Sequence, residues 1–147
     1  MLPFCEHAQV HTGAGADGIE RDDPFGGAYG AALGVRAGDF VFTTVAGVLE
    51  LRDGEPVFAG TFNEQLRLVG DHLRRRLAHF GCQVSDVADA TVWVHPSVEV
   101  PPGRLLDELQ LHVFGGVAPA MSFVRSPMLY PDALVGVKAV AFLPRDR

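Results

Sequence analysis

Several residues near the N-terminus are of types that bind metal ions. Cys5, His7 and His11 have the close spacing of zinc ligands. Structural zinc sites take four protein ligands, however, and no fourth ligand is evident beside these three. We therefore expect no bound metal and no cofactor. The other histidines follow no paired-ligand spacing and favour surface or capping roles: His72, His79, His95 and His112.

Two further motifs bear on cofactor binding and on nucleophilic catalysis. Residues 13–18 read GAGADG and match the GxGxxG pattern, but a dinucleotide site needs a helix next, and IERDDP at 19–24 predicts none. We expect a flexible glycine loop instead. No GxSxG motif occurs, and Cys82 follows Gly81 at the negative end of a predicted helix, which does not favour a thiolate. Cys82 is predicted to be structural.

A run of three arginines, Arg74, Arg75 and Arg76, could form a patch that binds an anion. These residues fall near the C-terminus of a predicted helix, where the helix dipole favours cations without any ligand. We interpret the run as a solvated helix face.

Composition restricts the class of protein. A chain of 147 residues with 48% hydrophobic content suffices for one core. The net charge of −6 disfavours a nucleic-acid partner. Two cysteines favour a reducing cytoplasm, and neither a signal peptide nor a membrane-spanning apolar run is evident. Eleven of the 12 basic residues are arginine, a bias that suggests a GC-rich bacterial genome.

The apolar pattern predicts one α+β domain. Residues 1–27 predict an extended N-terminal arm, and residues 28–147 predict the domain itself. A hairpin is expected within 31–48, and a looser hairpin or a long loop within 49–60. The periodicity of apolar residues predicts helices over 61–80 and 104–114. Thr61 and Glu64 have the spacing of a capping box at the start of the first helix, and Gly81 is expected to end it. Further strands are expected at 90–96, 120–126 and 133–142. This order implies a mixed β-sheet with two helices on one face.

Four segments occur in the order and spacing of one known family: GGAYGAALGVRAGDFVFTT, FNEQLRLVGDHLRRRLAHFGCQVSDVADATVWV, FGGVAPAMSFV and LVGVKAVAF. Over residues 26–142 the chain resembles the Rid family (YjgF type). The resemblance implies a chorismate-mutase-like (Rid-like) α+β fold, a homotrimer, and small-molecule pockets in the clefts between subunits. The activity that it implies is the hydrolysis of reactive enamines and imines, which releases ammonia and a 2-oxo acid.

The resemblance also assigns pocket positions, and few of them are kept. Tyr29 matches the pocket tyrosine, and Thr44 stands where the family has a serine. Val45 replaces the glycine after that serine, Met121 replaces the arginine that holds the substrate carboxylate, and Gly136 replaces a glutamate. A thioether cannot pair with a carboxylate. The resemblance therefore does not imply a standard 2-aminoacrylate deaminase.

The strand that follows Met121 supplies the remaining candidates. Ser122 and Phe123 are predicted to line the pocket with Val45, Met121 and Gly136. Arg125 faces the same side of the strand as Met121, because side chains alternate along a strand. Its guanidinium would either lean into the cleft or lie at the end of the sheet or in a trimer contact.

Three functions are compatible with these residues. The first is a diverged small-molecule enzyme on a specialised-metabolism intermediate, with Tyr29 or Thr44 as proton donor or acceptor in a less ionic pocket. The second is a non-catalytic metabolite-binding or regulatory trimer. The third is an enamine or imine deaminase that uses Arg125. Ribonuclease activity is disfavoured by the acidic balance.

Overall fold

The computed structural model of the chain describes residues 18–24, 32–47, 49–52, 55–58, 60–130 and 132–144. Tyr29 lies outside these ranges, as do the zinc-ligand candidates and all but the last glycine of the GAGADG loop. Residues 20–22 of the predicted arm form a short strand on the main sheet. The domain boundary at residue 27 stays a prediction.

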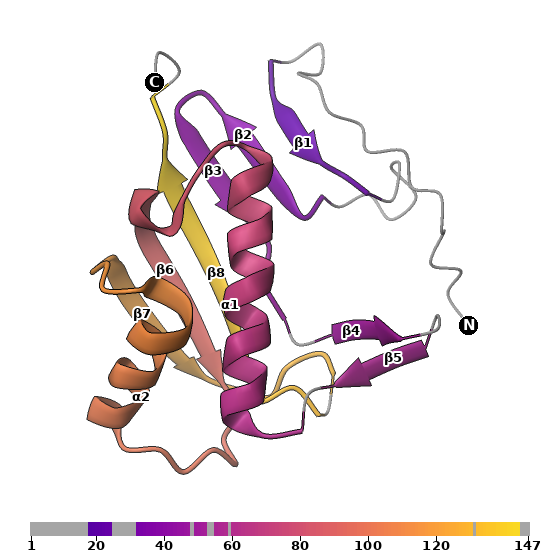
Figure 1. The fold of residues 1–147 in the computed structure, drawn as a ribbon, viewed down its shortest axis with the longest axis vertical. Helices are drawn as coiled ribbons and strands as arrows, with labels where there is room; N and C mark the ends of the chain where they lie inside the picture. The colour runs from indigo at the N-terminus through magenta and orange to yellow at the C-terminus, as the bar shows by residue number, and fades with distance from the viewer. Residues whose placement is uncertain are drawn as a thin grey trace.

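Six strands form one mixed sheet in the order β1-β2-β3-β8-β6-β7 (Figure 1). Only β6 and β7 pair in parallel, and the other neighbours are antiparallel. The strands are β1 (Glu20–Asp22), β2 (Gly34–Ala37), β3 (Phe40–Thr43), β6 (Val87–Val94), β7 (Ala120–Arg125) and β8 (Val135–Phe142). A separate hairpin pairs β4 (Leu49–Arg52) with β5 (Glu55–Phe58). The hairpin predicted within 31–48 is confirmed, and of the two alternatives for 49–60 the structure has the hairpin.

Two helices cover one face of this sheet (Figure 1). They are α1 (Phe62–His79) and α2 (Pro102–Leu109), and a short 3-10 turn at Val84–Asp86 leads into β6. From α1, Leu66, Val69, Leu73 and Leu77 are fully buried among the valines and alanines of β3, β6 and β8. Because alternate strand residues face the helices, one side of the sheet makes the core. The predicted layer of two helices on a mixed sheet is confirmed.

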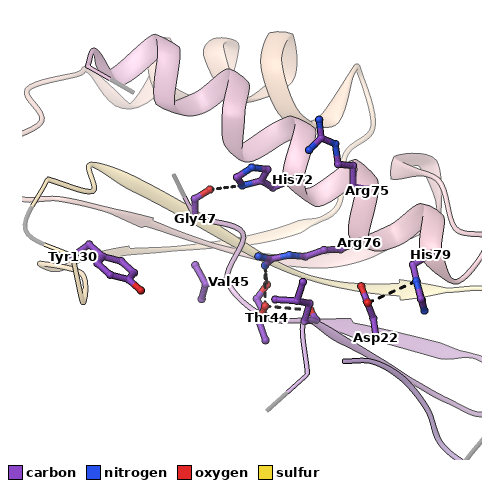
Figure 2. A pocket seen from close by; sticks show the side chains of 10 residues that line it. Asp22, Thr44, Val45, Gly47, His72, Arg75, Arg76, His79 and Tyr130 are labelled. Atoms are coloured by element: carbon purple, nitrogen blue, oxygen red, sulfur yellow. Dashed lines mark hydrogen bonds and ion pairs between the residues drawn. The ribbon is translucent and has the colours of Figure 1, made fainter. Parts of the chain in front are cut away.

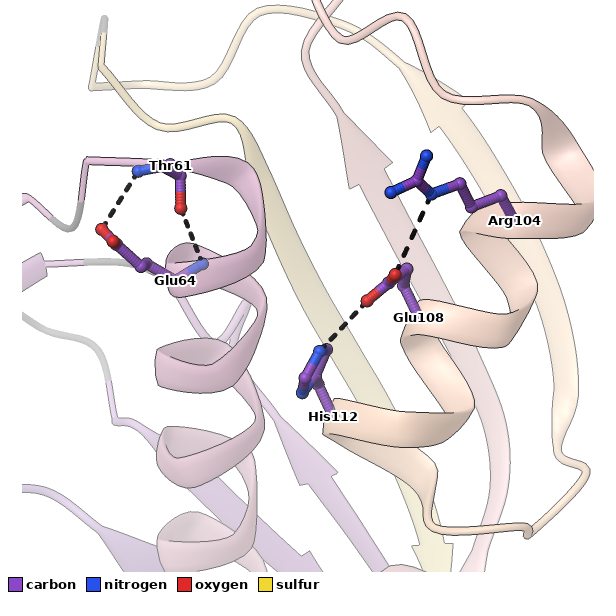
Figure 3. Close-up of polar contacts among 5 residues, drawn as sticks. All are labelled: Thr61, Glu64, Arg104, Glu108 and His112. Carbon is purple, nitrogen blue, oxygen red and sulfur yellow. Dashed lines mark hydrogen bonds and ion pairs between the residues drawn. The ribbon is translucent and has the colours of Figure 1, made fainter.

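The ends of α1 follow from its sequence. Thr61 accepts a hydrogen bond from the Glu64 amide at 3.2 Å, and the Glu64 carboxylate accepts one from the Thr61 amide at 3.2 Å (Figure 3). This reciprocal pair is the capping box that the sequence predicts. At the other end Gly81 adopts φ +77°, and the Cys82 amide donates to Leu77 at 3.0 Å. A left-handed glycine and this 6→1 bond define a Schellman end.

The second helix differs from its prediction at its C-terminal end. We expected a regular helix to Phe114, but the α-helix ends at Leu109 and a wider π turn continues over Gln110–Phe114. The Gly115 amide, with φ +60° at that glycine, donates to the Gln110 carbonyl at 2.8 Å. The π turn lies against Gly70 of α1, where a Cβ atom would collide with the His112 carbonyl oxygen. Gly70 is thus required by close packing between the two helical segments.

Within the described ranges, no helix covers the opposite face of the sheet. Phe40, Phe42 and Phe142 are 46%, 41% and 44% exposed on this face. The Phe40 ring lies 5.5 Å from that of Phe142 and 6.4 Å from that of Phe42, centroid to centroid. This side of the sheet therefore presents a cluster of exposed aromatic side chains.

None of the helices in the described ranges is both long enough and apolar enough to cross a membrane.

The Gly70 contact predicts a loss of stability on substitution by alanine, although alanine has the higher helix propensity. Gly70→Ala is expected to destabilise the protein by about 1–3 kcal/mol, because overpacking against a backbone oxygen outweighs the gain in helix propensity. The control is Gly103→Ala in α2, where a Cβ would meet nothing within 4 Å. That change should leave stability equal or raise it by up to about 1 kcal/mol. Urea denaturation of both variants checks this, and a stabilised Gly70→Ala protein would contradict the packing argument.

Candidate functional site

A cavity of about 520 Å³ lies between α1 and the segment that follows β3 (Figure 2). Its volume is within the range of small-molecule sites. The lining residues come from β1, the segments before β2 and after β3, α1, and the loop before β8: Asp22, Leu33, Thr44, Val45, Gly47, His72, Arg75, Arg76, His79 and Tyr130.

An irregularity between β3 and β8 positions one wall of this cavity. Phe42 pairs with Val140, and the next bridge joins Ala46 to Val137, so β3 has one residue more than β8 between the two pairs. Such a bulge re-aims side chains. The Thr43 hydroxyl accepts the Ala139 amide at 3.0 Å. The bulge places Thr44 and Val45 at the cavity.

The opposite wall is a polar stripe on α1. His72, Arg75, Arg76 and His79 follow the spacing i, i+3, i+4, i+7 and so lie on one side of the helix. Arg76 and His79 are partly buried, while Arg75 is exposed. In Figure 2 the Arg76 side chain points to Thr44, and the Arg75 guanidinium points away from it at the rim.

Arg76 connects α1 to the bulge. Its Nη1 donates to the Thr44 carbonyl at 3.2 Å and to the Thr44 hydroxyl at 2.8 Å. That hydroxyl donates in turn to the Leu33 carbonyl at 3.1 Å. The proton of Thr44 is thus already engaged, and we assign this residue a positioning role for Arg76. The predicted role of Thr44 as a proton donor stays untested.

The other edge of the Arg76 guanidinium is open to the cavity. No described residue accepts a hydrogen bond from Nε or Nη2 of Arg76, and no fully buried side-chain nitrogen in the described ranges lacks a partner. These N–H groups therefore reach accessible space. Burial lowers the pKa of Arg76, and the nearby Asp22 carboxylate opposes this shift. Arginine nonetheless stays charged in proteins, so a partly buried cation faces the cavity.

His72 is held as a neutral imidazole with one nitrogen available. Its Nδ1 lies 2.8 Å from the Gly47 carbonyl oxygen, which can only accept, so Nδ1 carries the proton. In the neutral ring, which the lowered pKa favours, Nε2 carries the lone pair. Desolvation by burial lowers the pKa of His72 from 6.5, the charges of Arg76 and Arg75 lower it further, and the bond to Gly47 opposes them. A neutral histidine of this kind can act as a general base.

The far end of the cavity contains an acidic group. Asp22 of β1 lies 3.7 Å from Nδ1 of His79, measured from its Oδ1. Among the described lining residues, and without counting the histidines, the two guanidinium groups of Arg75 and Arg76 and this one carboxylate give a net charge of about +1. In a chain of net charge −6, the cavity is therefore a local positive site.

The structure brings some of the predicted site residues together. Thr44 and Val45 line the cavity, and Gly136 lies against Val45. A Cβ at position 136 would stand 2.6 Å from Cγ1 of Val45, so the valine fills the space that a side chain there would need. Tyr29 is outside the described residues.

The candidates on β7 lie elsewhere. β7 is an edge strand of the sheet, separated from β3 by β8 and β6. This cavity is not lined by any of the β7 candidates, which are Met121, Ser122, Phe123 and Arg125. Met121 packs against the core, and Phe123 is 45% exposed. The Arg125 guanidinium donates to the Val98 carbonyl at 3.1 Å. Within one chain these residues do not join Thr44.

Sequence reasoning missed the stripe on α1. The interpretation of the arginine run as a solvated face holds for Arg74, which is exposed and pairs with Asp71 at 2.6 Å. It is wrong for Arg76, which is partly buried and bonded to Thr44. His72, for which a surface or capping role is expected, is half-buried and bonded to the Gly47 carbonyl at the cavity. The spacing of histidines and arginines along one helix side was the available signal.

Cys82 and the possible metal ligands are the remaining candidates for chemistry. Cys82 is buried at 3% exposure and belongs to the core, as predicted for a structural cysteine. Over the described ranges no group of three or more His, Cys, Asp or Glu side chains is arranged to hold a metal ion.

The fold defines the class of protein. A mixed sheet of this order with two helices on one face is the Rid-type, chorismate-mutase-like α+β fold, as expected from the sequence. A candidate endoribonuclease of Thermotoga maritima is 25% identical with a TM-score of 0.64, over 76% of this chain and 85% of that chain. A YjgF protein family member from Neisseria meningitidis is 23% identical with a TM-score of 0.63, over 88% and 97%.

A third solved structure with the same fold comes from another organism. A member of the YjgF/YER057c/UK114 family from Mycobacterium tuberculosis is 22% identical with a TM-score of 0.62, over 81% of this chain and 92% of that chain. No family model matches the sequence, and no curated protein matches it. The chain thus shares the Rid-type fold at low sequence identity.

The surroundings of His72 lead to a pH prediction. Its pKa should lie below 6.5, and Arg76→Leu should raise it by removing a nearby positive charge. Arg67→Leu is the control, because Arg67 is exposed on the same helix and is not a cause of the shift. NMR titration of the imidazole measures both effects.

The sign of the effect on stability follows by linkage. With a lowered folded-state pKa, the unfolded chain binds the His72 proton more readily below pH 6.5, so this residue's contribution to stability is lost as the pH falls. A His72 that titrates above 6.5 in the native protein would contradict the geometry.

Proposed function

We propose that the protein is a diverged Rid-like small-molecule enzyme and not a standard 2-aminoacrylate deaminase. His72 serves as general base and Arg76 as anion ligand in the cavity beside Thr44. The observation that carries this proposal is the pairing of a neutral imidazole, fixed by Gly47, with a guanidinium fixed by Thr44 in one cavity. The notion of a specialised-metabolism intermediate as substrate rests on the departures at Val45, Met121 and Gly136 from the Rid-like pocket pattern.

The proposed chemistry is proton transfer next to a carbonyl or imine carbon. The free edge of Arg76 binds the carboxylate or the developing oxyanion, as its planar donors favour. His72 takes a proton from carbon or from an attacking water through Nε2, and its lowered pKa keeps it unprotonated near neutral pH. Thr44 holds Arg76 in place and takes no part in the proton transfer.

Solvent exchange by NMR tests this chemistry. A panel of 2-oxo acids, 3-oxo acids and their imines is incubated with the protein in D₂O, and deuterium incorporation and hydrolysis are followed. We expect exchange on at least one compound, slowed by about 100-fold or more in His72→Gln, because general-base catalysis has that magnitude. His95→Gln is the matched control, since His95 is engaged with Ser97 at 2.7 Å and does not line the cavity.

Two results would refute the proposed function. One is rapid hydrolysis of 2-aminoacrylate that His72→Gln leaves unchanged. The other is exchange that depends on Arg125 and not on His72, which would favour the deaminase alternative. Binding of panel compounds with no turnover of any of them would favour a non-catalytic metabolite-binding trimer, which the lost charges at Met121 and Gly136 also support.

We further propose that the protein works as a homotrimer, with its pockets in clefts between subunits. The exposed aromatic face formed by Phe40, Phe42 and Phe142 supports assembly, since monomeric proteins rarely expose large apolar patches. The edge strand β7, with Met121, Phe123 and Arg125, would then contribute to a neighbour's cleft.

A charge on the aromatic face should break this assembly. Phe42→Glu is expected to convert trimers to monomers, because a buried carboxylate in an apolar interface is unfavourable. Leu111→Glu is the control, since Leu111 is 73% exposed on the helix side of the molecule. Analytical ultracentrifugation distinguishes the outcomes. A wild-type protein that sediments as a monomer at micromolar concentration would contradict the proposal.

A further inference from the structure

A second cavity adjoins the first at the same end of the sheet. Its volume is about 510 Å³, and it shares Val45, Gly47 and Tyr130 with the cavity described above. The rest of its lining comes from the end of β6, the start of β8 and the loop between β7 and β8, and it is mostly apolar: Trp93, Ser126, Pro127, Met128, Leu129, Ala133 and Val135. A polar cavity and an apolar cavity thus meet at common residues.

Gly136 sets the shape of the junction. A Cβ there would lie 2.6 Å from Cγ1 of Val45 and 3.4 Å from Sδ of Met128. The absent side chain therefore lets Val45 and Met128 converge over the strand, and the boundary between the cavities is lined by a valine and a thioether. Neither group can bind a charge or a carbonyl. The junction accordingly favours a hydrocarbon portion of a ligand.

The polar cavity supplies the charged end. Arg76 presents its Nε–Nη2 edge, which no described residue occupies, and Arg75 at the rim makes no hydrogen bond or ion pair with any described residue. With Asp22 opposing them, the net charge of about +1 matches a monoanion better than a dianion. A guanidinium edge binds a carboxylate through two parallel hydrogen bonds.

We infer that the two cavities form one site for a monoanionic amphiphile, with its carboxylate on Arg76 and its apolar body between Val45, Trp93 and Met128. This inference shares one premise with the proposed function, namely that the ligand occupies the polar cavity, and it adds the chemical class of the substrate. The ligand is a carboxylic acid with a chain or ring of several carbons, rather than a small amino-acid-derived imine.

Calorimetric binding of a homologous series tests the inference. The probes are butanoate, hexanoate and octanoate, with hexan-1-ol and hexyl phosphate as comparisons. Affinity should rise by about fourfold per methylene, the value expected for hydrocarbon leaving water. Hexan-1-ol should bind at least about 10-fold more weakly than hexanoate, because it lacks the charged hydrogen bonds to Arg76. Hexyl phosphate should bind no more tightly than hexanoate.

Two variants separate the ends of the site. Arg76→Gln should weaken every carboxylate by about 10- to 100-fold, as loss of a charged hydrogen-bonding partner does. Met128→Gln, which keeps the side-chain length, should weaken octanoate while leaving butanoate unchanged. Arg67→Gln is the control, because Arg67 is exposed on the same helix and lines neither cavity. Circular dichroism confirms that each variant is folded.

Several results would overturn the inference. Affinity independent of chain length would show that the apolar cavity does not bind the hydrocarbon chain. Equal affinity for hexan-1-ol and hexanoate would show that Arg76 does not bind the carboxylate. Markedly tighter binding of hexyl phosphate than of hexanoate would show that the site prefers a dianion to a monoanion. Absence of any solvent exchange by the wild-type protein, with intact chain-length dependence of binding, would refute the enzyme proposal alone.

Discussion

The contact between Arg76 and Thr44 determines the geometry of the site. A guanidinium from a helix reaches a loop and donates to both the carbonyl and the hydroxyl of one threonine. A partly buried cation is costly to desolvate unless polar groups surround it. Thr44 meets only part of this requirement, because one edge of the guanidinium stays open. The same contact therefore holds α1 against the β3 bulge and leaves one edge of the guanidinium exposed for a ligand.

The layer of helices provides the rigidity that this contact needs. On α1 the leucines at 66, 73 and 77 are fully buried, and the polar residues that face the cavity alternate with them along the helix. A shift of α1 would expose this apolar stripe, so the packing that stabilises the fold also fixes His72 and Arg76. The bulge in β3 adds the second fixed point. Rigid elements thus position both walls of the cavity.

The sequence predicted the architecture better than the site. Capping and glycine signals at Thr61, Glu64 and Gly81 predicted both ends of α1, because these signals are local. The burial of Arg76 depends on a bulge in a strand about thirty residues earlier, and no local pattern reports that contact. The π turn after Leu109 was missed for the same reason, since it follows from its packing against α1.

The packing of Val45 on Gly136 has a consequence for how such a pocket changes over evolutionary time. The two positions occupy one volume, with 2.6 Å between the valine methyl and a Cβ at position 136. A large residue at 136 is therefore accessible only after position 45 has become small, whereas the opposite order passes through a steric collision. The shared volume therefore constrains the order in which the two positions change, and the residues at 45 and 136 are expected to covary.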